Sequence, residues 1–458
     1  MSGVRKDLRA MCADGAAWSV MVGIGETYLP AFVLALTASQ LACGLVATVP
    51  MISGAVLQLI SPYVVRRLGS YRLWVVLCAT VQAAAFVPLL VGALVGTLPL
   101  VVVFAAASLY WGASLATGPA WNAWVETLVP QRLRARFFAR RSHLSQFGLL
   151  GGFVIGGLVL QVGTKPEAPL AAFALLFFVA AVSRLISAHY LGSQREPLPP
   201  GNSLRGLGVG ELVSTVRQDA TGRLLLFMLA TQMAVSIAGP YFTPYMFVHL
   251  RLSYSGFVVV VCAAFLAKIL LLPAVGRIVQ RWGANRVLWT SGMIIAPIPA
   301  LWLLYDGFAY LLALKVLAGT TWAAYELATL LLFFETIPNA KRLSILTIFN
   351  LGYATAIVVG SLVGGLILVA LGSGREAYLA IFVVSTIARV AALALLVRMP
   401  KVALASLSVA TRPIALRPSI GTVDRPVLPS LSESEGAPHR QEHARQAASP
   451  IPELELGA

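Results

Sequence analysis

Long apolar stretches recur along this chain, and their length constrains the fold more than any other feature. A helix needs about 20 mostly apolar residues to cross the hydrocarbon core of a bilayer, and twelve stretches meet that need. Only 11% of the 458 residues are charged, whereas soluble proteins carry about 25%. The sequence therefore predicts an all-α integral membrane protein with twelve transmembrane helices. The predicted spans are residues 16–37, 42–65, 72–94, 98–128, 144–163, 169–191, 223–249, 254–277, 286–305, 308–335, 344–371 and 376–398.

A polar linker with three prolines divides these spans into two groups of six. It occupies residues 193–222, between an N-terminal half (16–192) and a C-terminal half (223–399). Residues 1–15 are predicted to form a cytoplasmic N-terminus. Residues 400–458 are rich in Pro and Ser without hydrophobic periodicity, which predicts a disordered tail.

Lys and Arg residues are distributed unevenly over the predicted loops. One side of the membrane receives 22 of them, and the other receives Lys165, Arg251 and Arg375. Because cytoplasmic loops retain positive charge, both termini are predicted to be cytoplasmic. The net charge of +16 is then a topology signal, and no nucleic-acid partner is expected. We expect a multi-pass protein of the cell membrane, which in a bacterium is the inner membrane.

The two halves repeat one another in the same direction. "GETYLPAFVLAL" (25–36) aligns with "GPYFTPYMFVHL" (239–250), and "RRLGSYRLW" (66–74) with "QRWGANRVL" (280–288). "GGLVL" (156–160) is matched by "GGLIL" at 364–368. A parallel repeat of six spans predicts a substrate site between the halves, near the middle of the membrane.

Over residues 12–400 the sequence resembles the major facilitator superfamily of secondary transporters. The signature of that family, G-x-L-x-D-R-x-G-R-K/R, joins spans two and three. Arg66, Gly69 and Arg72 match its first copy, with Val65 in the place of the acid. Its second copy has Gln280 in the acidic position and matches at Gly276, Ile278, Arg281, Gly283 and Arg286.

The resemblance implies a cytoplasmic gate at these loops, although both of its usual acids are replaced. Glu126 and Glu335 stand at matching ends of spans four and ten, each beside an arginine-rich loop. We therefore predict that they supply the missing gate contacts. The predicted partners are Arg66, Arg67 or Arg72 for Glu126, and Arg277 or Arg281 for Glu335.

A second signature, G-P-x-x-G-G in span five, is associated with antiporters of the family. Here Phe153 replaces its proline, while Gly152, Gly156 and Gly157 match. The same partial pattern recurs in span eleven at Gly360, Gly364 and Gly365. Close packing of helices through small residues explains both patterns, and we favour this explanation over reading the glycines as an antiporter signature.

Three ionisable residues lie deep in predicted spans. Glu26 is central in span one, Lys268 in span eight and Glu326 in span ten. A charge at the bilayer centre costs about 2.5 to 3.5 kcal/mol on insertion scales and marks a functional candidate. We expect Lys268 and Glu326 to form an ion pair and Glu26 to carry a proton or attract a cation; structural roles are the alternatives. Lys315, Arg184 and Arg389 lie nearer to span ends and are predicted to extend to the interface.

In the resembled fold, spans one, four, seven and ten line the central cavity. The aromatic residues predicted to line it are Tyr28, Trp111, Tyr241, Tyr245 and Tyr325. Candidate hinges, where helical hydrogen bonds are missing, are Pro30, Gly239, Pro240 and Pro244.

These features favour a proton-coupled exporter of an amphiphilic or cationic small molecule, working by alternating access. Uptake or facilitated diffusion of a polar metabolite is the related alternative, and a non-transporting scaffold or sensor with the same fold is the other. No nucleotide loop, metal-ligand set or catalytic triad is recognisable, so we expect no enzyme and no cofactor. The expected partners are the substrate, protons and the bilayer, and we expect a monomer.

Overall fold

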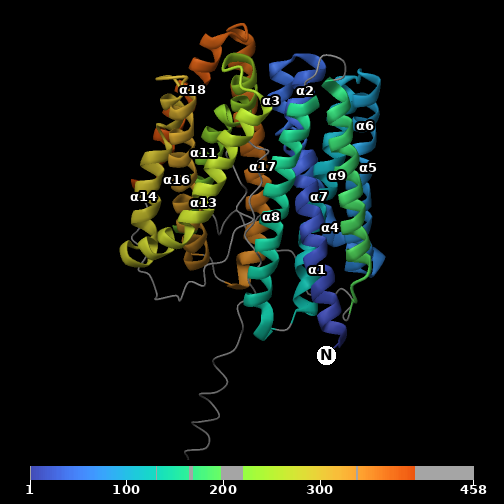
Figure 1. Cartoon of the computed structure of the whole chain (residues 1–458). Coiled ribbons are helices and arrows are strands. Elements are labelled where there is room, and N and C mark those ends of the chain that lie inside the picture. Colours follow the sequence, from blue (N-terminus) through green and yellow to red (C-terminus); the bar gives the residue numbers. More distant parts are fainter. Residues whose placement is uncertain (1, 130, 164–168, 197–219, 337–338, 398–458) are drawn as a thin grey trace, which may run out of the picture.

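The computed structural model describes residues 2–129, 131–163, 169–196, 220–336 and 339–397. Most of the predicted linker and the whole predicted tail lie outside these ranges. Within them, every regular element is a helix. Figure 1 shows two bundles of long helices side by side.

The N-terminal half forms the first bundle. Its helices are α1 (Ser2–Met21), η1 (Val22–Glu26), α2 (Leu29–Thr37), α3 (Gln40–Val46), α4 (Met51–Leu68), α5 (Tyr71–Ala84), α6 (Phe86–Val95), α7 (Leu100–Leu128), α8 (Gln131–Gly163) and α9 (Pro169–Gly192). The first helix begins well before the predicted first span. Its early turns pack against α8 and α9, and Asp7, Met11 and Asp14 on it are buried.

The C-terminal half forms the second bundle. Its helices are α11 (Ala220–Ala238), η2 (Gly239–Tyr241), α12 (Phe242–Pro244), η3 (Tyr245–His249), α13 (Tyr254–Trp282), α14 (Ala284–Ile295), α15 (Ile298–Leu301), α16 (Phe308–Thr336), α17 (Asn339–Ala370) and α18 (Arg375–Val397).

Eleven passes within the described ranges are long and apolar enough to cross a membrane. The predicted ninth span, residues 286–305, is instead divided between α14, of 12 residues, and α15, of 4 residues. The division falls at Ala296 and Pro297, because proline lacks the N–H group that a continuous helix requires. Neither piece has the length of a membrane-spanning helix.

Local sequence signals fix where several helices begin and end. The hydroxyl groups of Ser39, Ser70 and Ser253 each accept a backbone N–H at the start of α3, α5 and α13. Such side-chain caps satisfy donors that have no partner within the helix. At the end of α4, Gly69 adopts a φ of +65°, a conformation that glycine reaches without steric cost.

The two ends of the bundle are called the basic end and the distal end. The basic end carries the N-terminus (Figure 1) and the helix segments that contain Arg66, Arg67, Arg72, Arg141, Arg277, Arg281 and Arg286. The distal end is opposite and carries the loop between α2 and α3, Asp306 and Arg375.

The helices of spans one and seven are interrupted at equivalent places. Span one passes through the π-helix η1, a turn at Thr27 and Tyr28, and then α2 with Pro30 in its first turn. Span seven contains the 3₁₀ turn η2, which includes Pro240, and the π-helix η3. The sequence predicted both interruptions. Motion about them stays a prediction.

A tyrosine ring lies on each glycine pair of the repeat. The Tyr28 hydroxyl donates to the Phe153 carbonyl over 2.6 Å, and a Cβ atom at Gly156 would lie 2.6 Å from the Tyr28 ring. Only a helix without a side chain at that position admits the ring.

The second half repeats this arrangement. The Tyr241 hydroxyl donates to the Ser361 carbonyl over 2.6 Å, and a Cβ atom at Gly364 would lie 2.6 Å from the Tyr241 ring. Tyr28 and Tyr241 are therefore structural equivalents, one residue away from the sequence alignment of "GETYL" with "GPYFT". Both glycine patterns act in helix packing, as we favoured.

The two halves are joined toward the distal end. Hydrogen bonds connect the Tyr378 hydroxyl to Gln40 (2.6 Å), the Thr48 hydroxyl to Ser361 (2.8 Å) and the Ser255 backbone N–H to Gln161 (3.1 Å). Aromatic contact between Phe153 and Phe257, with ring centroids 6.1 Å apart, adds to them. In this structure the halves are closed against each other at that end.

Candidate functional site

Glu26 lies at the end of η1, inside the N-terminal bundle, and its residue is 4% exposed. The Tyr110 hydroxyl of α7 donates to Glu26 Oε2 over 2.5 Å. The neighbouring Gly25 admits this close packing, because a Cβ atom there would lie 2.7 Å from both Phe86 and Ala180. The Tyr110 hydroxyl thus helps to hold the Glu26 carboxylate in place inside the bundle.

The Lys268 amino group of α13 lies 2.8 Å from Glu326 Oε1 and 2.6 Å from Oε2 on α16. The side chains are 8% and 4% exposed. This is the pair that the sequence analysis expected. Because each charge offsets the other, the cost of burying both is lower than that of burying either alone.

Lys315 is also buried, at 4% exposure. Its amino group lies 5.6 Å from the ring centroid of Phe242 and 5.2 Å from that of Trp302. A lysine over aromatic faces is stabilised by the ring quadrupoles. The prediction that Lys315 extends to the interface is wrong, because the rings that hold it lie inside the bundle.

Arg184 and Arg389 are each 3% exposed, so their predicted extension to the interface is wrong as well. Arg184 donates to Ser187 over 2.6 Å, and Arg389 donates to the Ile295 carbonyl over 3.1 Å. Both guanidinium groups find partners within their own half.

The aromatic residues predicted to line the cavity lie in different packing environments. Tyr28 and Tyr241 pack on the glycine pairs. Trp111 lies edge-on to Tyr110, beside Glu26. Tyr245 contacts His249, Trp302, Tyr378 and Phe382 near the distal end. Tyr325 contacts Phe227 and Trp322.

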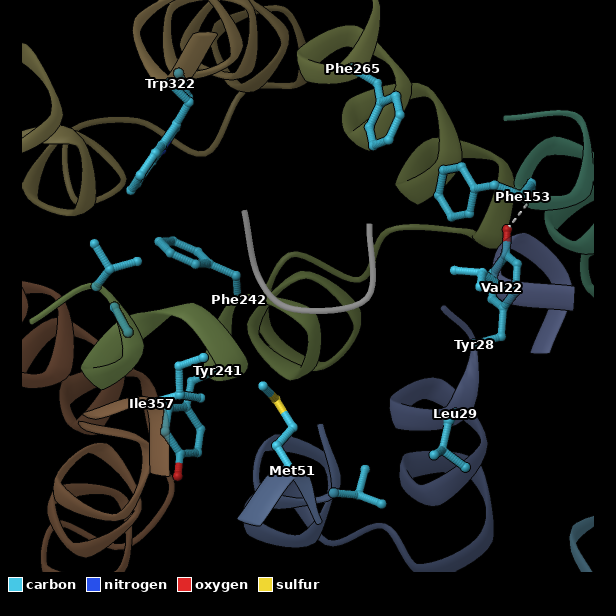
Figure 2. Close-up of a cluster of buried hydrophobic side chains, with 14 of the residues drawn as sticks. Val22, Tyr28, Leu29, Met51, Phe153, Tyr241, Phe242, Phe265, Trp322 and Ile357 are labelled. Carbon is cyan, nitrogen blue, oxygen red and sulfur yellow. Dashed lines mark hydrogen bonds between the residues drawn. The ribbon is translucent and has the colours of Figure 1, made fainter. Parts of the chain in front are cut away.

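Other apolar side chains from both halves surround the middle of the view in Figure 2. They are Met51 of α4, Phe242 of α12, Phe265 of α13 and Trp322 of α16. Trp322 and Glu326 are four residues apart on α16, and Phe265 and Lys268 are three apart on α13. Because such spacings place residues on one helical face, the ion pair lies beside these aromatic groups.

Among the predicted gate residues, two arginines make contacts within the part of the chain that the structure describes. Arg72 donates to the Gln194 carbonyl over 3.4 Å, and Arg67 lies over the Tyr63 ring. Arg66, Arg277, Arg281 and Arg286 are exposed. The side chains of Glu126 and Glu335 lie outside the part that the structure describes, so their contacts stay a prediction. Gly69 and Gly283 end α4 and α13 with positive φ angles, and Gly276 is buried within α13.

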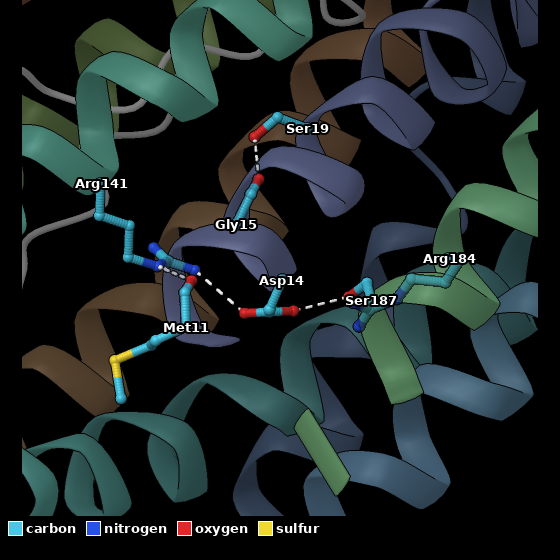
Figure 3. A network of polar contacts seen from close by, with 7 residues as sticks. All are labelled: Met11, Asp14, Gly15, Ser19, Arg141, Arg184 and Ser187. Carbon is cyan, nitrogen blue, oxygen red and sulfur yellow. Dashed lines mark hydrogen bonds and ion pairs between the residues drawn. The ribbon is translucent and has the colours of Figure 1, made fainter. Parts of the chain in front are cut away.

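A polar network near the basic end of the N-terminal half was not predicted from the sequence. Figure 3 shows Asp14 of α1 between Arg141 of α8 and Ser187 of α9. Arg141 lies 3.4 Å from the Asp14 carboxylate, which also accepts from the Ser187 hydroxyl over 2.6 Å. Arg184 donates to the same hydroxyl. Sequence separations of 127 and 173 residues hid these contacts.

Two further acids stabilise the same end. Asp7 pairs with Arg195 at 2.7 Å. Glu196 accepts from Ser70, and from the backbone N–H groups of Tyr71 and Arg72 at the start of α5. A carboxylate at a helix N-terminus satisfies otherwise unpaired donors and favours the helix dipole.

A surface cavity of about 460 Å³ has none of these charged residues in its lining. It is lined by Val76, Thr80, Leu185, Ala188, His189, Gly192 and Ser193. These residues belong to α5, α9 and the turn that follows, on the outside of the N-terminal bundle. Among the residues the structure covers, no group of three His, Cys, Asp or Glu side chains is placed to hold a metal ion.

Comparisons with known proteins agree with the fold. Solved structures similar to this chain include a mutant of the nucleoside transporter NupG, with a TM-score of 0.67 and 12% identity, covering 86% of this chain and 100% of the other. A bacterial homologue of the human lysosomal transporter Spinster, in an inward-facing and occupied conformation, has a TM-score of 0.62 and 14% identity; the match covers 85% of this chain and 95% of the other. The transporter FucP in the outward conformation has a TM-score of 0.54 and 14% identity; the match covers 86% of this chain and 99% of the other.

The family model described as Major Facilitator Superfamily matches residues 224–428. A comparison with curated proteins found no match. The sequence match covers the C-terminal half, and the structural similarity extends the fold over both halves. The sequence of the C-terminal half is thus similar to the Major Facilitator Superfamily, and both halves have the fold of these solved transporters.

Proposed function

We propose that the chain exports an amphiphilic cation in exchange for protons. The observation that carries this proposal is the buried Glu26 carboxylate, with Tyr110 as a hydrogen-bond donor. A proton and a cation compete for one carboxylate, because each neutralises it. A site that holds one or the other, but not both, exchanges them in opposite directions. An inward proton gradient then drives the cation outward.

The surroundings support an amphiphilic substrate. Phe242, Phe265, Trp322 and Met51 are buried apolar side chains contributed by both halves (Figure 2), and aromatic faces bind flat or cationic groups. Rocking of the six-helix halves would expose this surface to each side of the membrane in turn. We further propose that the basic end is cytoplasmic, on the asymmetry of Lys and Arg.

The test uses purified full-length protein in liposomes with ethidium as the cationic probe and a pH-sensitive dye inside. An imposed pH gradient is expected to drive ethidium against its concentration, and Glu26→Gln is expected to lower this rate at least about tenfold, as loss of a transport-coupling charge worth about 1.4 kcal/mol or more would. Glu376→Gln is the matched control, because Glu376 is an exposed acid at the start of α18. Ethidium-driven proton movement that survives Glu26→Gln would show that the coupling role is wrong.

The Lys268–Glu326 pair favours a second candidate, the uptake or facilitated diffusion of a polar metabolite. An ion pair offers a donor and an acceptor close together, which suits a neutral, hydroxyl-rich molecule. Uridine is a suitable probe, since one similar structure is a nucleoside transporter. Uridine flux without a pH gradient, lost in the double variant Lys268→Met, Glu326→Gln but retained in Glu26→Gln, would favour this candidate over proton exchange.

A further inference from the structure

Gln82 is a buried amide whose polar atoms lack protein partners. It lies on α5 with 0% exposure, and neither its Nε2 nor its Oε1 is hydrogen-bonded to another residue in the described ranges. Nearly all buried polar side chains have a partner, and an amide without one is costly. Ordered water commonly supplies the partner when the protein does not.

The neighbours of Gln82 place it between two charged groups. Cys78, Gln82 and Phe86 follow one another at intervals of four residues, so they lie on one stripe at the end of α5 and the start of α6. α5, which carries Cys78, packs against α9, the helix that carries Arg184. On the other side of Gln82, the Phe86 ring lies 5.3 Å from the Tyr110 ring, centroid to centroid, and Tyr110 donates to Glu26.

The polar network of Figure 3 continues this series toward the basic end. Arg184 bonds to Ser187, Ser187 bonds to Asp14, and Asp14 pairs with Arg141. The Arg141 side chain is 18% exposed, so the series ends near solvent. Buried polar groups are thus present on neighbouring helices of the N-terminal half, in a network near the basic end, at Gln82 and at Glu26.

We infer that Gln82 binds internal water and that this series gives Glu26 proton access from the basic end. A proton enters from solvent near Arg141, passes by exchange of O–H bonds through water at Gln82, and forms an O–H bond on the Glu26 carboxylate. Gln82 is left unchanged. The inference rests on the proposed proton coupling through Glu26.

Five helices contribute charged or titratable groups to this path. Those facing it are Asp14 of α1, Cys78 of α5, Tyr110 of α7, Arg141 of α8 and Arg184 of α9. The two carboxylates of Asp14 and Glu26 offset the charges of the two arginines. A proton passing through therefore meets no large net charge.

The path is tested by infrared spectroscopy of the full-length protein in lipid after a pH jump on the basic side. The protonated carboxyl band that is lost in Glu26→Gln reports the proton on Glu26. Gln82→Leu keeps the side-chain volume but removes both polar atoms. It is expected to slow the appearance of the band by about tenfold, the factor that loss of about one hydrogen bond gives. A water O–H band that shifts in water labelled with heavy oxygen is expected to disappear in the same variant.

Two controls separate this effect from disturbed packing. Gln232→Leu makes the same change to a buried glutamine of the other half, which bonds to Ser236, and is expected to leave the rate unchanged. Gln82→Ser leaves room for water, so the Glu26 band is expected to appear at close to the wild-type rate in this variant. An unchanged rate in Gln82→Leu, with the Glu26 band present, would overturn the proton path alone. A wild-type protein without a Glu26 band would overturn both the coupling role and the path.

Discussion

At the scale of single residues, each buried charge is offset by a different kind of partner. Glu26 has a phenolic hydroxyl, Lys268 and Glu326 have each other, and Lys315 has two aromatic faces. Each arrangement reduces the cost of desolvation. Under the proposed exchange of protons, Glu26 can lose its charge without leaving an unpaired ion, whereas loss of charge on either member of the ion pair would leave the other uncompensated.

Breaking the buried ion pair is expected to destabilise the protein strongly. Lys268→Met leaves Glu326 without its cation inside the bundle, and removal of one member of a buried pair costs about 3 to 5 kcal/mol. The double variant Lys268→Met, Glu326→Gln is expected to recover much of this loss, because no uncompensated charge is left. Thermal unfolding in detergent measures both.

The exposed pair of Arg375 and Asp306 provides the control for that prediction. Its atoms are 2.7 Å apart, and the side chains are 57% and 41% exposed. Arg375→Met is expected to cost less than about 1 kcal/mol. If the double variant Lys268→Met, Glu326→Gln were as unstable as Lys268→Met alone, the prediction would be contradicted, because the lost stability would then come from packing and not from the uncompensated charge.

The Lys268–Glu326 pair was predictable from the sequence because opposite charges stood at similar depth. The Tyr110 contact of Glu26 was not, because sequence alone does not fix the rotation of one helix against another. Trp111, the residue expected near the cavity, is the immediate neighbour of Tyr110. The contact of Asp14 with Arg141 was missed for another reason: residues 1–15 were expected to lie outside the membrane bundle.

At the scale of elements, the repeated glycines fix how closely helices approach. A Cβ atom at Gly364 would lie 2.1 Å from the Ile237 carbonyl, as well as close to Tyr241. The repeat in the sequence located these glycines. It did not reveal that a tyrosine lies on each pair, because the aligned positions differ by one residue between the halves.

Gly364→Ala is expected to destabilise the protein by about 1 to 3 kcal/mol, as overpacking of a close contact does. Backbone of α11 would have to move to admit the methyl group. The matched change is Gly151→Ala, because a Cβ atom there meets nothing within 4 Å. In that helix interior alanine is expected to be neutral or to stabilise by up to about 1 kcal/mol. Equal unfolding temperatures for the two variants would contradict this packing argument.

At the scale of the whole molecule, the length of the apolar stretches was enough to predict a helical membrane protein with two halves. The sequence did not predict the break in the ninth span, since its apolar pattern continues through Pro297. Nor could it predict which end of the molecule is closed. That property depends on contacts between the halves, such as the bond of Thr48 to Ser361, which join positions 313 residues apart.

Removing this bond is expected to shift the molecule away from the state with a closed distal end. Thr48 and Ser361 are both fully buried, and Ser361 also donates to the Val358 carbonyl, so Thr48→Val leaves that serine satisfied. Loss of one hydrogen bond worth about 1 kcal/mol changes the ratio of closed to open molecules about fivefold. Valine keeps the shape of threonine, so the change is confined to the hydroxyl.

Distances between spin labels measure this shift. One pair, at Val95 and Leu371, reports the distal end, and another, at Leu68 and Ile278, reports the basic end; all four positions are exposed. In Thr48→Val the distal pair is expected to gain a longer distance while the basic pair gains a shorter one, because rocking couples the two ends. Thr117→Val is the matched control, since that hydroxyl bonds to Ala113 within α7. If both variants give the wild-type distribution, the bond between the halves does not contribute to distal closure.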